Sequence, residues 1–158
     1  MGRTTCREMI DQLKSKNLEL DATSFFSQFQ SNQPVIVLDV REREEVMLGM
    51  LPKARHIPRG LLEYSIEKAV PNPKTPIVVY CQGGVRSLFA AHTLTVMGYE
   101  HVKSLKGGFS NWRGQGFPIE TNKNGPKVSI SNPNWFWVCM CTLSFGIGVL
   151  LMVVRNFL

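Results

Sequence analysis

The fold is indicated most clearly by the stretch Pro76-Ile-Val-Val-Tyr-Cys-Gln-Gly-Gly-Val-Arg-Ser87. A run of β-branched and aromatic residues leads directly to Cys81, and a Gly-rich turn then opens a helical pattern from Arg86 to Met97. A short continuous apolar run is typical of a strand that is buried on both faces of a parallel sheet. The stretch therefore predicts a buried strand, a tight turn and a helix in succession.

Strands and helices continue to alternate on both sides of this stretch. A second buried strand is expected over Pro34 to Asp39 and a short strand over Val102 to Leu105. Helices are expected over residues 10–30, with a cap at Thr23 or Ser24, and over residues 41–48, 60–69 and 107–115. This alternation predicts an α/β fold, in which a parallel sheet is flanked by helices and the crossovers are right-handed.

Charge divides the chain into two unlike parts. Its 158 residues suffice for one domain of ordinary size, and all but one of its charged residues lie within residues 1–127. No charged residue lies between Val128 and Val154. We therefore expect an N-terminal extension over residues 1–19, a globular domain over 20–120 and a linker over 121–134.

Residues 135–154 form an uncharged run that is long enough, as a helix, to cross a hydrocarbon core of about 30 Å. Two tryptophans stand at its start, where indole rings favour the headgroup level. We expect one C-terminal transmembrane helix at 135–154 and a short tail at 155–158, with a buried core helix as the alternative. A lipid bilayer is then a partner, and Ser144 with Gly148 offers a small-residue pair against which a membrane-protein partner would pack.

The basic balance of the chain suits an anionic small substrate and an anionic lipid surface equally well. The net charge is +6, but the basic residues are scattered and form no nucleic-acid-binding motif, so no nucleic-acid partner is expected. Lys123 and Lys127 before the apolar run outnumber Arg155 after it, which places the soluble domain on the cytoplasmic side. The four cysteines have neither a disulfide pattern nor metal-ligand spacing, so no metal is expected.

The chemistry of the chain centres on Cys81. Ligands of open α/β sheets bind at the carboxyl ends of the strands, which is where this cysteine falls. The two glycines let successive N–H groups point inward, and the following helix N-terminus adds partial positive charge, so the turn stabilises a thiolate and holds an anion. Arg86 would add a cation. The alternative is that Cys81 is simply a small buried residue at a strand end.

The spacing around Cys81 also excludes two known anion-binding loops. No Gly-Lys-Ser/Thr follows the glycines, so the turn is not a P-loop. Four residues separate Cys81 from Arg86, whereas the Cys-x5-Arg loop of tyrosine phosphatases has five, and a phosphoryl cradle built on the longer loop would not close in the same way.

Several motifs, in order, resemble the rhodanese-like family. They are Asp39-Val-Arg41-Glu42 with Glu45, Ala54-Arg-His-Ile-Pro58, Cys81-Gln-Gly-Gly-Val-Arg-Ser87, Gly98-Tyr99, Leu105-Lys-Gly-Gly108, Trp112 and Gly116-Phe-Pro118. The resemblance covers roughly residues 20–120. It implies a single-domain sulfurtransferase without a metal or organic cofactor, rather than a phosphatase of the same fold.

The resemblance also implies roles for individual residues. Cys81 would accept a sulfane sulfur as a persulfide from an anionic donor and pass it to a thiol or to cyanide. The N–H groups of the following loop would hold the persulfide's charge; this loop comprises Gln82, Gly83, Gly84, Val85, Arg86 and Ser87. Asp39 and Arg41 would form a structural pair behind the loop, and Trp112 would lie in the core.

One segment departs from the family's pattern. Where the family reads Gly-His-Ile-Pro-Gly-Ala, this chain has Gly49-Met-Leu-Pro-Lys-Ala54, so the local turn geometry is open. The nearby basic residues form either an entrance that attracts an anionic donor or a solvated loop; they are Lys53, Arg55, His56 and Arg59. Two other functions stay open: a non-catalytic interaction module or accessory subunit of a membrane complex, and a redox or arsenate-reducing enzyme with Cys6 as its resolving thiol.

Overall fold

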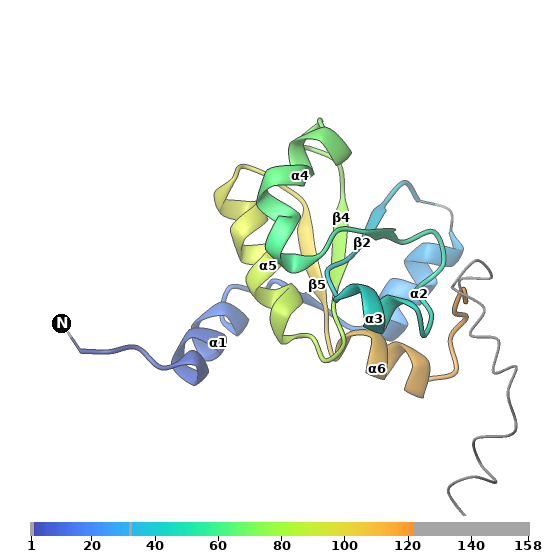
Figure 1. The fold of residues 1–158 in the computed structure, drawn as a ribbon, viewed down its shortest axis with the longest axis horizontal. Helices are drawn as coiled ribbons and strands as arrows, with labels where there is room; N and C mark the ends of the chain where they lie inside the picture. Colours follow the sequence, from blue (N-terminus) through green and yellow to red (C-terminus); the bar gives the residue numbers. More distant parts are fainter. Residues whose placement is uncertain (1, 32, 122–158) are drawn as a thin grey trace, which may run out of the picture. The chain divides into compact units, whose positions relative to one another are not determined.

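The computed structural model describes residues 2–31 and 33–121, and within them the chain forms a five-stranded parallel sheet flanked by helices (Figure 1). The strands are β1 (Glu19–Leu20), β2 (Ile36–Asp39), β3 (Arg55–His56), β4 (Ile77–Tyr80) and β5 (Val102–Leu105). The helices are α1 (Cys6–Lys14), α2 (Ala22–Gln30), α3 (Arg43–Val46), α4 (Leu62–Ala69), α5 (Val85–Val96) and α6 (Gly108–Gly114), with a 3-10 turn η1 (Arg59–Leu61) before α4. The predicted α/β fold is confirmed.

The strand order is β1-β5-β4-β2-β3, and every pair of neighbours is parallel. All four residues of β4 are buried, as its continuous apolar run predicts for a strand that is covered on both faces. Strand β2 pairs with β4 along its whole length, with Asp39 opposite Tyr80. The carboxyl ends of β2 and β4 therefore lie side by side, and the residues that follow them meet at one edge of the sheet.

Two apolar clusters hold helices on opposite faces of the sheet. On one face, Leu38 and Val79 pack with residues of α4 and α5; on the other, Val37 and Val78 pack with residues of α2 and α6, as Figure 1 also shows. Trp112 of α6 is fully buried in the second cluster, where its Nε1–H donates to the Pro118 carbonyl over 2.8 Å. The expectation that Trp112 is a core residue is confirmed.

The single helix expected over residues 10–30 is wrong. Helix α1 ends at Lys14, Asn17 takes a left-handed φ of +53°, and residues 19–20 form the edge strand β1 beside β5. Helix α2 then begins after Asp21, whose carboxylate accepts the N–H of Ser24 over 2.9 Å, so the cap is Asp21 and not Thr23 or Ser24. An aspartate before the helix satisfies an N–H group that residues inside the first turn leave free.

The other expected helices are present with shifted ends. The helix expected over residues 41–48 is the four-residue α3, and the one expected over 60–69 is divided between η1 and α4. Strand β3 was not expected. The predicted transmembrane helix at 135–154, the tail at 155–158 and almost all of the linker lie outside the described residues. Among the helices that the structure does describe, none is long and apolar enough to span a bilayer.

Candidate active site

Cys81 lies directly after β4, at the carboxyl edge of the sheet, and only 1% of its surface is exposed. Three residues later, Gly84 takes a φ of +95° and becomes the N-cap of α5. This left-handed conformation suits glycine and turns the chain sharply from strand to helix. The turn brings the Gly84 N–H to 3.2 Å from the Cys81 Sγ, so the sulfur accepts a backbone hydrogen bond.

Residues 81–86 are called the Cys81 loop below. The start of α5 adds partial positive charge to this loop. The N–H groups of the first helical turn, beginning at Val85, have no carbonyl partner within the helix. Together with the peptide dipoles of a 12-residue helix, they place partial positive charge at this end of α5. The loop can therefore hold negative charge on the sulfur without a cationic side chain.

Ser87 closes the loop rather than facing the sulfur. Its Oγ–H donates to the Gly84 carbonyl over 3.0 Å, and its Oγ lies 2.9 Å from the Oγ of Ser104 on β5. Both serines are fully buried. The pair fixes the last residue of the predicted loop to the neighbouring strand. Ser104 was not expected in the site, because nothing in the sequence relates two serines 17 positions apart.

The beginning of α6 holds the other end of the loop. The Phe109 N–H donates to the Cys81 carbonyl over 2.8 Å, and the Ser110 N–H donates to the Gln82 carbonyl over 3.0 Å. Gly108, at a φ of +56°, allows this approach, because a Cβ there would lie 2.2 Å from the Cys81 carbonyl oxygen. In the sequence, this contact is marked only by the glycine pair at 107–108. The structure shows why glycine is needed there.

The side chain of Gln82 is engaged away from the sulfur. Its Nε2 donates to the Ser110 Oγ over 2.9 Å, and its Oε1 accepts from Arg41 over 3.3 Å. Gln82 thereby connects α6 to the polar residues that follow β2. It adds no charge to the loop.

Asp39 and Arg41 form a fully buried ion pair behind the loop. The Arg41 Nε–H lies 3.0 Å from both Asp39 carboxylate oxygens, and its Nη2 lies 2.7 Å from Oδ2. The same guanidinium donates to the carbonyls of Glu45 and Gly49 and stacks on the Phe109 ring at 4.2 Å. Although burial disfavours the charged form, the hydrogen bonds and charge of Asp39 hold the pKa of Arg41 above its ordinary value.

Arg86 is paired with Glu45. Its two terminal nitrogens donate to the two Glu45 oxygens, each over 2.7 Å, which joins α5 to α3. Hydrogen bonding from Arg86 is the main reason that the pKa of Glu45 falls to about 2, so this carboxylate stays ionised under ordinary conditions. The sequence predicts Arg86 as a fixed cation beside Cys81. The structure holds Arg86 in an ion pair with Glu45, which the sequence indicates only as a motif position, so the charge of Arg86 is compensated.

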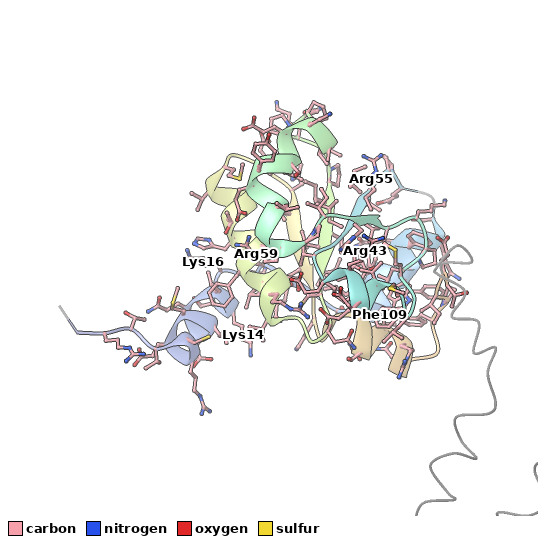
Figure 2. All side chains as sticks on the ribbon, in the orientation of Figure 1. Lys14, Lys16, Arg43, Arg55, Arg59 and Phe109 are labelled. Atoms are coloured by element: carbon pink, nitrogen blue, oxygen red, sulfur yellow. The ribbon has the colours of Figure 1, made fainter. Side chains whose placement is uncertain are left out.

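The predicted basic entrance is not brought together as one group. Arg55 donates to the Ala69 carbonyl, His56 hydrogen-bonds to the Arg41 carbonyl, and Arg59 pairs with Glu63 at 2.6 Å. Lys53 lies over the Phe29 ring at 5.6 Å. Figure 2 likewise shows the labelled Arg55 and Arg59 at separate places, on β3 and η1.

The departing segment 49–54 has a well-defined geometry. Gly49 has a φ of +124°, and its carbonyl accepts from Arg41 over 2.6 Å. Met50 exchanges two backbone hydrogen bonds of 2.8 Å with Glu120. Lys53 takes a φ of +58°, the left-handed region that favours glycine, at the position where the family's pattern has glycine. The turn therefore holds a lysine in a conformation that favours glycine.

Neither of the described cysteines is in a disulfide: Cys6 is exposed on α1, whereas Cys81 is buried. Within residues 2–31 and 33–121, no group of three His, Cys, Asp or Glu side chains is arranged to hold a metal ion.

Comparison with known proteins identifies relatives of this arrangement. The family model described as a rhodanese-like domain matches residues 22–115. The chain is 32% identical over 101 residues to a sulfurtransferase of Allochromatium vinosum, covering 64% of this chain and 92% of the relative. It is 31% identical over 90 residues to the thiosulfate sulfurtransferase GlpE of Coxiella burnetii, covering 57% and 82% of the two chains.

A solved structure from Rhodopseudomonas palustris, described as a protein of unknown function and possible tyrosine phosphatase, matches with a TM-score of 0.67. It is 32% identical, and the match covers 76% of this chain and 99% of that one.

Proposed function

Because the chain belongs to the rhodanese-like domain family, we propose that it is a sulfurtransferase that carries sulfur on Cys81. The Cys81 thiolate attacks the outer sulfur of an anionic donor such as thiosulfate. The donor's S–S bond breaks, sulfite leaves with the electron pair of that bond, and a Cys81 persulfide forms. A thiolate or cyanide then attacks the terminal sulfur, which yields a new persulfide or thiocyanate and regenerates the Cys81 thiolate.

One observation carries this proposal: the Gly84 N–H donates to the Cys81 Sγ at the carboxyl end of β4, beneath the start of α5. Sulfur transfer needs a thiolate at the beginning and end of the cycle and an anionic persulfide between them. Backbone N–H groups and a helix N-terminus stabilise the negative charge of each of these states. Because these groups do not titrate, they act in the same way throughout the cycle. The names of the relatives, sulfurtransferase and thiosulfate sulfurtransferase, support the same chemistry.

The surrounding residues keep the loop in place for this reaction. The N–H groups of Phe109 and Ser110 hold the carbonyls of Cys81 and Gln82, while Ser87 fixes the far end of the loop to Ser104. We assign Asp39 and Arg41 to positioning, because Arg41 reaches the Gln82 side chain and not the sulfur. A loop held from both ends keeps the Gly84 N–H directed at the sulfur through both half-reactions.

The proposal includes a membrane anchor at residues 135–154, supported by the uncharged run there. If the anchor exists, the full chain stays in the membrane fraction after alkaline carbonate washing, whereas a chain truncated at residue 125 is released. Release of the full chain by carbonate would contradict anchoring but not sulfur transfer.

Thiocyanate formation from thiosulfate and cyanide tests the catalytic proposal. We expect turnover by the wild type and none by Cys81→Ser. The matched control is Cys6→Ser, which removes the exposed thiol of α1 and leaves the loop intact. We expect it to keep full activity, and a loss there would favour the redox alternative with Cys6 as resolving thiol. A folded wild type without turnover, whose membrane partners still co-purify with Cys81→Ser, would favour the interaction module.

A further inference from the structure

Arg86, the last residue of the Cys81 loop, and Arg41 behind the loop are each neutralised by a carboxylate. Arg41 is paired with Asp39 and Arg86 with Glu45, at 2.7 Å in both cases. The Arg41 pair is fully buried, whereas the Arg86–Glu45 pair is partly exposed, with 37% and 29% of the side chains accessible. A donor that approaches the loop therefore meets Arg86 together with the negative charge of Glu45.

The other side chains of the loop do not change this charge balance. Gln82 is neutral and engaged with Ser110 and Arg41, and the residues at 83–85 carry no charge. Arg43 is exposed on α3, two positions before Glu45, and residues at this spacing do not face the same way on a helix. Among the described residues, what remains to bind a donor is mainly the partial charge of backbone N–H groups, which suits one negative charge better than two.

We infer that Glu45 determines donor specificity by charge: it occupies Arg86, so that the loop favours donors of low charge, such as organic persulfides, over dianionic thiosulfate. This inference rests on the sulfur transfer proposed above. With a persulfide donor, the Cys81 thiolate attacks the terminal sulfur of R–S–SH. The donor's S–S bond breaks and R–S⁻ leaves. The transferred sulfur passes its proton to R–S⁻, which gives R–SH and the anionic Cys81 persulfide.

A matched pair of probes isolates the effect of donor charge. Methanethiosulfonate and thiosulfate each offer an outer sulfur bound to an oxidised sulfur, but the first is a monoanion and the second a dianion. The experiment measures the single-turnover rate of sulfur loading on Cys81 of the full chain with each probe. The ratio of the thiosulfate rate to the methanethiosulfonate rate cancels effects on the thiolate itself, because these change both rates alike.

Substitutions of Glu45 and of Arg86 should change this ratio in opposite directions. Glu45→Gln leaves the Arg86 charge unpaired and should raise the ratio roughly five- to tenfold, as one added charge a few ångströms away does in a partly exposed site. Glu45→Gln retains an oxygen that can accept the Glu42 N–H. Arg86→Gln leaves Glu45 uncompensated and should lower the ratio by a similar factor. The double variant restores neutrality and should return the ratio to the wild-type value.

Glu63→Gln is the control, because it frees Arg59 from a comparable exposed pair. Arg59 reaches Thr93 of α5, eight residues beyond Val85 and so roughly 12 Å along the helix from its start. The ratio should not change in this variant. If both probes load sulfur but neither partner's substitution moves the ratio, Glu45 does not determine donor charge, and sulfur transfer still stands. If no probe loads sulfur on the folded wild type, the proposed function itself fails, and this inference with it.

Discussion

Gly108 lies directly against the backbone of Cys81. A Cβ at Gly108 would stand 2.2 Å from the Cys81 carbonyl oxygen and 2.8 Å from that of Gln82. This close approach lets α6 donate two N–H groups to the first two residues of the loop. The position of Cys81 is therefore fixed by a helix 27 residues further along the chain.

Gly108→Ala should damage both stability and sulfur transfer. The new methyl group would collide with rigid backbone, and alanine is strained at a φ of +56°, so we expect a loss of about 3 kcal/mol or more in the free energy of unfolding. Urea unfolding followed by circular dichroism measures it. Gly114→Ala in the same helix is the control, because its Cβ meets no atom within 4 Å. A wild-type stability for Gly108→Ala would contradict the close contact.

Asp39→Asn should be among the most destabilising changes of a single side chain. It leaves the buried Arg41 guanidinium without its counter-charge, for which a cost of about 3–5 kcal/mol is expected. The exposed Arg59–Glu63 pair gives the comparison, since Glu63→Gln should cost no more than about 1 kcal/mol. Similar unfolding midpoints for the two variants would show that the buried pair is not a central support of the site.

The Arg86–Glu45 pair should make stability depend on acid pH. The pKa of Glu45 is lowered to about 2 in the folded state, so its stabilisation is present above the unfolded value near 4.5. It is lost as the pH falls from 4.5 towards 2, because the unfolded chain then binds the proton first. Since the pair is partly exposed, we expect about 1 kcal/mol.

Glu45→Gln should accordingly be less stable than the wild type at pH 7 and approach it at pH 2. Chemical unfolding of both proteins across this range measures the difference. A gap that stays constant down to pH 2 would mean that Glu45 contributes through packing and not through its charge.

Lys53 should tolerate glycine better than a β-branched residue. Its φ of +58° costs a non-glycine residue on the order of 1 kcal/mol in the folded state, and Lys53→Gly removes this cost. Glycine also gives the unfolded chain more conformational freedom, which offsets part of the gain in stability. We expect Lys53→Gly to be neutral or stabilising by about 0.5 kcal/mol and Lys53→Val to be destabilising by about 1–2 kcal/mol. Thermal unfolding of both variants tests this order, and the reverse order would contradict the left-handed turn.

The sequence was most informative where local pattern and tertiary position agree. The apolar run before Cys81 and the glycines after it predicted β4, the turn and α5, and the family resemblance drawn from the motifs is confirmed by the match over residues 22–115. The expected α/β fold with a parallel sheet is confirmed for the same reason. Parallel strands that are covered on both faces need continuous apolar residues, and such runs can be recognised directly in the sequence.

Other features depend on contacts that no local pattern reveals. Strand β3 has only two residues, and its strand character comes from pairing with β2. The turn at Asn17 and the cap at Asp21 divide residues 10–30, and each is a single-residue feature that the apolar spacing does not reveal. Glu45 and Arg86 lie 41 positions apart, so the sequence does not reveal that they pair. It therefore does not reveal that the charge of Arg86 beside Cys81 is compensated.

The most direct test of sulfur transfer through Cys81 is the intact mass of the full chain, with and without thiosulfate or methanethiosulfonate, beside Cys81→Ser. We expect a gain of one sulfur atom on the wild type alone, which is lost again on adding cyanide or a thiol. A folded wild type whose Cys81 still reacts with an alkylating agent but gains no sulfur from these donors or from an organic persulfide would contradict sulfur transfer.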